Sequence, residues 1–103
     1  MQKHNALITG ASSGIGLVFA KELVKEGYQV TCVARNEKKL KSLVNELGDG
    51  HRYISADLTD QNDIQKIVND VEKTKYNLLI MQDTVYTISL KISQLRKQII
   101  LFN

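Results

Sequence analysis

The chain of 103 residues contains no proline and no tryptophan, and it has a single cysteine. The lone Cys32 cannot form an internal disulfide, and the apolar run around it favours a small buried thiol over a nucleophile. No apolar run approaches the ~20 residues that a membrane-spanning helix needs, and the N-terminus does not resemble a signal peptide. These absences predict a cytoplasmic protein in a reducing setting, with no membrane partner.

Acidic residues are fewer than basic ones, 11 against 14, which gives a formal net charge of +3. The densest basic cluster comprises Arg35, Lys38, Lys39 and Lys41. Two interpretations of this cluster remain open: a solvated helix face, or a site for a phosphate-bearing ligand. No aromatic ladder accompanies the cluster, so we expect no nucleic-acid partner.

Continuous apolar runs, typical of buried strands, alternate along the chain with apolar stripes at helical spacing. The expected strands cover residues 5–9, 29–34, 52–56 and 77–81. A first helix is expected over 14–26, and Gly27 provides its left-handed C-terminal cap. A second helix is expected between an Asn36 cap and Gly48, and a third helix is expected to be capped by Thr59.

Strands and helices that alternate through short links predict an α/β fold with parallel strands joined by right-handed crossovers. We expect a partial Rossmann fold over residues 1–81, with a parallel sheet of about four strands in the order 3-2-1-4 and helices on both faces. Residues 82–103 form a divergent tail in which 83–87 has no clear period and a helix is expected near 90–100. Such a half-sheet leaves part of one apolar face uncovered, which favours self-association unless the tail covers it.

The stretch Thr9–Gly16 lies between the first expected strand and the first expected helix. A glycine-rich turn into a helix presents backbone N–H groups at the positive end of the helix dipole, which favours phosphate binding. Gly10 permits the sharp departure from the strand, Gly14 lets a pyrophosphate approach the backbone, and Gly16 lets the helix pack on the sheet. Ser12 and Ser13 either donate hydroxyl hydrogen bonds to phosphate oxygens or stabilise the turn itself.

The end of the second strand, about 20 residues further on, is where a dinucleotide-binding fold discriminates between the two forms of the ribose. The residues there are Ala34 and Arg35, with no acidic residue to accept hydrogen bonds from the 2′-hydroxyl of NAD. A guanidinium group suits the 2′-phosphate of NADP, so NADP(H) is favoured over NAD(H). The alternative is that Arg35 is a solvated surface residue. Asp57 follows the third strand and is expected beside the same crevice.

These features resemble the N-terminal cofactor-binding half of the short-chain dehydrogenase/reductase family. The resemblance covers about residues 5–80 and depends on Thr9-Gly10-x-x-x-Gly14-x-Gly16, on Arg35, and on Asp57-Leu58. It implies an oxidoreductase that transfers hydride between NADP(H) and a carbonyl or alcohol substrate, and it implies that Asp57 contacts the adenine with Leu58 beside it. The candidate cofactor-binding residues are Gly10, Ser12, Ser13, Gly14, Ile15, Gly16, Arg35, Asp57 and Leu58. We assign no catalytic and no metal-binding residue.

The sequence departs from the family pattern after the fourth strand, where Met81-Gln82-Asp83-Thr84 replaces Asn-Asn-Ala-Gly. Members of the family also need a serine and a tyrosine with a lysine four residues later, which lowers the tyrosine pKa for proton exchange with the substrate. No tyrosine in this chain has a lysine at that spacing. We therefore expect a truncated chain that is inactive alone. A working enzyme, a non-catalytic dinucleotide-binding fragment and a structural or partner-binding remnant are the three functions to be separated.

A frameshift is one hypothesis for this departure. Back-translation of residues 80–87 in a frame shifted by one base permits codons for Asn-Asn-Ala-Gly, although only the alanine is forced. The residues from about Met81 onward would then be an out-of-frame tail. Sequencing the gene tests this hypothesis, which fails if the codons used there cannot spell the motif.

Overall fold

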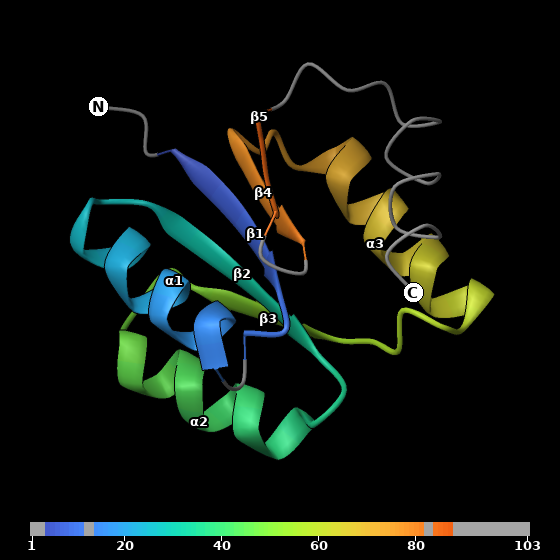
Figure 1. The fold of residues 1–103 in the computed structure, drawn as a ribbon, viewed down its shortest axis with the longest axis horizontal. Coiled ribbons are helices and arrows are strands. Elements are labelled where there is room, and N and C mark those ends of the chain that lie inside the picture. Colours follow the sequence, from blue (N-terminus) through green and yellow to red (C-terminus); the bar gives the residue numbers. More distant parts are fainter. Residues whose placement is uncertain (1–3, 12–13, 82–83, 88–103) are drawn as a thin grey trace.

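The computed structural model describes residues 4–11, 14–81 and 84–87 (Figure 1). Its elements are β1 (Asn5–Thr9), α1 (Gly14–Lys25), β2 (Gln29–Ala34), α2 (Glu37–Leu47), β3 (Arg52–Ser55), α3 (Gln61–Lys73), β4 (Leu78–Met81) and β5 (Thr84–Thr87). The sheet has the order β3-β2-β1-β4-β5, and the first four of these strands pair in parallel. The predicted parallel sheet with the order 3-2-1-4 is therefore confirmed.

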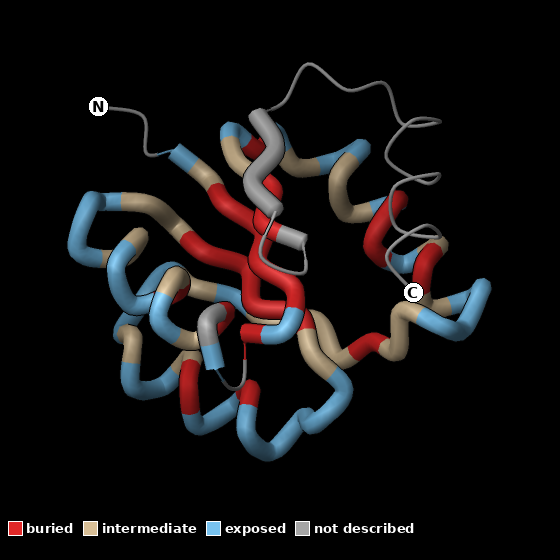
Figure 2. Tube along the Cα trace, in the orientation of Figure 1, coloured by how far each residue is buried: buried red, intermediate tan, exposed pale blue. Residues whose placement is uncertain are grey.

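Apolar side chains form two separate cores because the sheet is covered on both faces (Figures 1 and 2). On one face Leu7 and Leu79 join the cluster formed by the buried residues of α3. On the other face Ala6, Ile8 and Ile80 join the cluster beneath α1 and α2. Successive residues of a strand point to opposite faces, so the uninterrupted apolar run of β1 supplies both cores. The predicted placement of helices on both faces is confirmed.

The first helix ends as the sequence predicts, at a left-handed glycine. Gly27 has a φ of +92° and donates its N–H to the Val24 carbonyl at 3.0 Å, while the Tyr28 N–H donates to the Leu23 carbonyl at 2.9 Å. This pair of bonds is a Schellman motif, which satisfies two carbonyls at the end of the helix. It turns the chain directly back into β2.

The N-terminal caps of the other two helices gave one correct and one wrong prediction. Asn36 caps α2, and its side chain accepts a hydrogen bond from the Lys39 N–H at 3.1 Å. Thr59 does not cap α3; Asp60 does, and its carboxylate accepts from the N–H groups of Asn62 and Asp63. The hydroxyl and the N–H of Thr59 donate instead to the Asp57 carboxylate, at 2.6 and 2.9 Å.

Strand β5 was not predicted, because residues 83–87 show no regular alternation. It pairs antiparallel to β4, from Leu78 opposite Thr87 to Met81 opposite Thr84. The helix predicted near 90–100 lies outside the described residues, and the proposed domain boundary after residue 81 stays a prediction.

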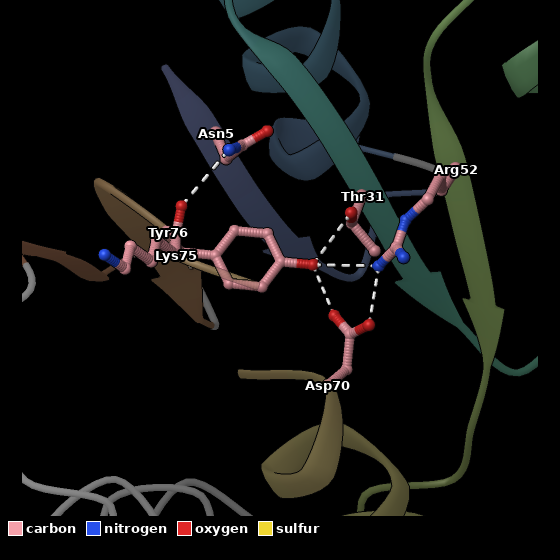
Figure 3. Close-up of polar contacts among 6 residues, drawn as sticks. All are labelled: Asn5, Thr31, Arg52, Asp70, Lys75 and Tyr76. Carbon is pink, nitrogen blue, oxygen red and sulfur yellow. Dashed lines mark hydrogen bonds and ion pairs between the residues drawn. The ribbon is translucent and has the colours of Figure 1, made fainter. Parts of the chain in front are cut away.

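A polar cluster ties α3 to the sheet at the end opposite the glycine turn (Figure 3). The Tyr76 hydroxyl lies 2.9 Å from the Thr31 hydroxyl and also bonds to the Asp70 carboxylate. The Arg52 guanidinium donates to Asp70 at 2.6 Å and to the Tyr76 oxygen at 3.2 Å. Burial raises the pKa of Tyr76 to about 12, and the bond to Asp70 acts in the same direction. Tyr76 therefore stays a neutral phenol that joins β2, β3 and α3.

Candidate nucleotide-binding site

The glycine turn connects the carboxyl end of β1 to the first turn of α1. Gly10 and Gly14 have φ values of +67° and +60°, a region that side chains disfavour, and a Cβ added at either residue would meet no atom within 4 Å. Ala11, between them, is fully buried and donates its N–H to the Val33 carbonyl of β2 at 3.3 Å. Two predicted site residues, Ser12 and Ser13, lie outside the described residues.

Gly16 marks the closest approach of α1 to the sheet. A Cβ at this position would lie 2.3 Å from the Gly10 carbonyl oxygen and 3.1 Å from the Thr9 carbonyl oxygen. Real Cβ atoms do not approach other atoms this closely, so only glycine lets α1 begin directly against the turn. The packing role predicted for Gly16 is thus explained by a measured contact. The backbone of Ile15, the residue before it, lies in the first turn of α1.

Arg35 and Asp57 follow two neighbouring parallel strands at their carboxyl ends. Arg35 comes directly after β2 and is exposed, while its carbonyl accepts a hydrogen bond from the Ser55 hydroxyl of β3 at 3.1 Å. The Ala56 N–H donates to the Ala34 carbonyl at 2.9 Å, which continues the pairing of the two strands past the end of β3. These two bonds hold the segment that carries Asp57 beside the one that carries Arg35.

The Asp57 carboxylate is held in its charged form. Hydrogen bonds from the Thr59 hydroxyl and N–H lower the pKa of Asp57, and the charge of Arg35 acts in the same direction. Both bonds go to Oδ1; the other carboxylate oxygen, Oδ2, has no hydrogen bond to a described residue. The backbone N–H of Asp57 donates to the Asp63 carboxylate at 2.8 Å. Leu58, next in sequence, is half-buried against the α3-side core.

Ser55 and Thr59 are two residues that the sequence analysis did not assign to this edge. The signal for Thr59 was present, because an aspartate commonly bonds to the backbone two residues further on. A threonine just before an amphipathic stripe also fits a helix cap, and the cap interpretation was wrong. Ser55 had no such signal, since only strand pairing brings its hydroxyl to Arg35.

Cys32 takes no part in the site. It is fully buried under α1 and α2, and burial raises the pKa of its thiol to about 12. The predicted small buried thiol is confirmed. In the part of the chain that the structure describes, no group of His, Cys, Asp and Glu could hold a metal ion. Within the same residues, no helix is long and apolar enough to cross a membrane.

An open parallel sheet in the order 3-2-1-4, with a glycine turn at the point where the strand order reverses, defines half of a doubly wound, Rossmann-type fold. Comparison with known proteins gives the family. The family model of short chain dehydrogenases matches residues 4–91, and the chain belongs to this family.

Three relatives illustrate the match. A 3-oxoacyl-(acyl-carrier-protein) reductase from Rickettsia bellii is 43% identical over 70 residues, which are 68% of this chain and 29% of the relative. The 3-ketoacyl-(acyl-carrier-protein) reductase from Brucella melitensis, solved with NADH, is 33% identical with a TM-score of 0.67, over 74% of this chain and 32% of that one. A short-chain dehydrogenase from Sphingobium yanoikuyae, solved with NADPH, is 31% identical with a TM-score of 0.71 over the same shares.

The match covers only part of each relative. The chain spans 20% to 30% of the length of eight curated relatives that it matches. The activities of those longer proteins are therefore not assigned to this chain by the comparison.

Proposed function

We propose that this chain binds NADP(H) and is the cofactor-binding part of an oxidoreductase that transfers hydride between NADP(H) and a carbonyl or alcohol substrate. The observation that carries the proposal is the contact at Gly16, because it brings the first turn of α1 directly against the turn at the end of β1. This arrangement aims backbone N–H groups and the positive end of a helix dipole at the crevice, where a pyrophosphate would be bound.

The space around Gly14 supports the same role. A Cβ at Gly14 would meet no protein atom within 4 Å, so the backbone there is open to a ligand from the crevice side. Gly10, with its positive φ, starts the sharp turn that clears this space. Ser12 and Ser13 would add hydroxyl donors to the phosphate oxygens.

Asp57 and Leu58 would hold the adenine. The Oδ2 atom of Asp57 has no partner among the described residues, whereas Oδ1 is fixed by Thr59. A charged carboxylate with one free oxygen is an acceptor suited to an exocyclic amino group. Leu58 is half-buried beside it and offers an apolar contact for the ring.

The preference for NADP(H) depends on Arg35. Its exposed guanidinium follows β2 at the place where the fold meets the ribose, and it can pair with a 2′-phosphate in a bidentate manner. The solved relatives include one with NADH and one with NADPH, so family membership leaves the choice open. The preference is thus a property proposed for this chain from its own residues.

A second candidate, a dinucleotide-binding chain without turnover, is favoured by the hairpin of β4 and β5. Met81 pairs with Thr84, so the chain reverses at the carboxyl end of β4, where the nicotinamide side of the crevice would be built. The 103 residues also contain no tyrosine with a lysine four positions later. Positioned proton transfer typically supplies ~10²–10⁴-fold in rate, and its loss would leave little activity.

Two assays separate these functions. Titration of the full chain with NADPH, followed by nucleotide fluorescence, is expected to give saturable binding, whereas incubation with aldehydes and ketones is expected to give no steady NADPH consumption. Gly14→Ala should weaken binding, because its methyl group would enter the space left for the pyrophosphate. Gly27→Ala is the matched control, since Gly27 has a positive φ and open space but lies at the far end of α1.

The outcomes decide between the candidates. Binding that Gly14→Ala weakens and Gly27→Ala preserves supports the proposed site. Equal effects of the two variants would place the ligand elsewhere, and no NADPH binding would refute the proposal. Steady NADPH oxidation would overturn the expectation that the chain is inactive alone.

A further inference from the structure

A groove runs between α1 and α2, which lie side by side on one face of the sheet (Figure 1). It has a volume of about 320 Å³ and is lined by Leu17, Lys21, Lys38, Lys39, Ser42, Leu43 and Glu46. Three of the seven lining residues are lysines and one is acidic, so the groove carries a positive charge. A cavity lined in this way is suited to an anionic group.

The lysines of the basic cluster differ in whether their charge is already compensated. Lys21 pairs with Glu46 across the groove at 3.3 Å, and Lys41, outside the groove, pairs with Glu37 at 3.7 Å. The exposed ammonium groups of Lys38 and Lys39 form no ion pair with any residue that the structure describes. Two positive charges in the groove are therefore available to a ligand.

The groove begins beside the proposed cofactor site. Leu17, one of its lining residues, directly follows Gly16, and Lys38 is only three residues beyond Arg35. Both helices begin at the carboxyl ends of their preceding strands, so this end of the groove faces the crevice. The Asn36 side chain already accepts a hydrogen bond from the Lys39 N–H. The groups left for an anion are therefore the two lysine ammonium groups.

We infer that Lys38 and Lys39, together with Arg35, form the subsite for the 2′-phosphate of NADP(H) and so determine the choice of cofactor. The inference rests on the proposed function, because it places the phosphate at the ribose end of that site. A phosphate at neutral pH carries more than one negative charge, whereas NAD has only a neutral hydroxyl at this position. Arg35 can bind the phosphate through a bidentate contact, and the lysines act as point charges.

The test measures binding of NADP⁺, NAD⁺ and 2′,5′-ADP to the full chain by calorimetry. In the double variant Lys38→Gln/Lys39→Gln, the affinities for NADP⁺ and 2′,5′-ADP should fall about tenfold, which corresponds to two exposed ion pairs. The affinity for NAD⁺ should not change. The double variant Lys38→Arg/Lys39→Arg should keep the preference, because it keeps both charges. Lys41→Gln is the matched control, since it removes one charge from the same helix outside the groove.

Each alternative outcome overturns the inference in a distinguishable way. If the wild-type chain prefers NADP⁺ and the Gln variant keeps that preference, the lysines are a solvated helix face and the proposed function stands. If Lys41→Gln lowers the NADP⁺ affinity as much as the double variant does, the effect is general charge and no subsite exists. Equal binding of NADP⁺ and NAD⁺ by the wild type removes the phosphate subsite, and no binding of either refutes the proposed function as well.

Discussion

Gly16→Ala tests whether the contact between α1 and the glycine turn holds the fold together. An added Cβ would lie 2.3 Å from the Gly10 carbonyl oxygen, whereas ordinary contacts begin at 3.4 Å. The overlap of about 1.1 Å must be relieved by moving α1 away from β1. Both partners are backbone, and Ala20 on the same helix is fully buried, so this movement would also disturb the core.

The expected cost is about 3 kcal/mol, at the upper end of the range for overpacking, because no flexible side chain can yield. A domain of this size has a free energy of unfolding of ~5–15 kcal/mol, so the loss is a large fraction of the total. Urea unfolding followed by circular dichroism measures it. With a slope of ~1.5 kcal/mol per M, the midpoint should fall by about 2 M at unchanged slope.

Gly10→Ala separates this clash from backbone strain. Gly10 has a positive φ but open space around its Cα, so alanine there should cost only ~1–2 kcal/mol of left-handed strain. The reasoning is refuted if Gly16→Ala destabilises the chain no more than Gly10→Ala does.

Three further predictions concern other parts of the molecule. Tyr76→Phe should lower the free energy of unfolding by about 1–3 kcal/mol in urea titrations, because it removes the buried hydroxyl that joins Thr31, Asp70 and Arg52. Tyr53→Phe, which loses a single bond to Glu37, is the control and should cost less than ~0.5 kcal/mol; equal effects would contradict the role of the cluster. Thr59→Val removes the hydroxyl that lowers the Asp57 pKa, so the carboxyl pKa followed by NMR should rise toward its usual value; an unchanged titration would show that Thr59 does not hold the carboxylate. Because the folded pKa of Asp57 is depressed, its stabilising effect is present above the unfolded pKa of ~3.9 and is lost as the pH falls below it. Finally, we predict self-association through the sheet face that the half-fold leaves uncovered, and a monodisperse monomer in sedimentation velocity would contradict it.

The parallel sheet could be predicted from the sequence because each of its signals is local. The apolar run of β1 has no polar alternation, and the glycine after α1 matches the helix end in the structure to the residue. Once strands and helices alternate through short links, the rules for parallel crossovers leave few arrangements. The strand order then followed with no knowledge of any contact.

The cap of α3 could not be decided in the same way. Thr59 and Asp60 are both common capping residues, and they stand next to each other before the same apolar stripe. The choice was decided by a third residue, because Asp57 accepts both donors of Thr59 and leaves Asp60 to the helix. Competition among three neighbouring polar residues depends on geometry that a sequence pattern does not contain.

Strand β5 and the polar cluster around Tyr76 depend on distant partners. A short segment such as Thr84–Thr87 becomes a strand only because β4 offers a free edge for pairing. Tyr76 reads as an isolated aromatic residue in the sequence, and its hydroxyl meets Thr31 from a position 45 residues away. The glycine motif, in contrast, identified the nucleotide-binding site because all of its geometry lies within one turn.

Pairing on both sides of β4 has a consequence for completing the fold. In a doubly wound sheet, the next parallel strand would be added beside the fourth. In this chain β4 already pairs with β1 on one side and with β5 on the other. A separately supplied C-terminal half could therefore extend the sheet only by strand exchange, after β5 had given up its hydrogen bonds. Reconstitution from two pieces would be limited by the rate at which this hairpin opens.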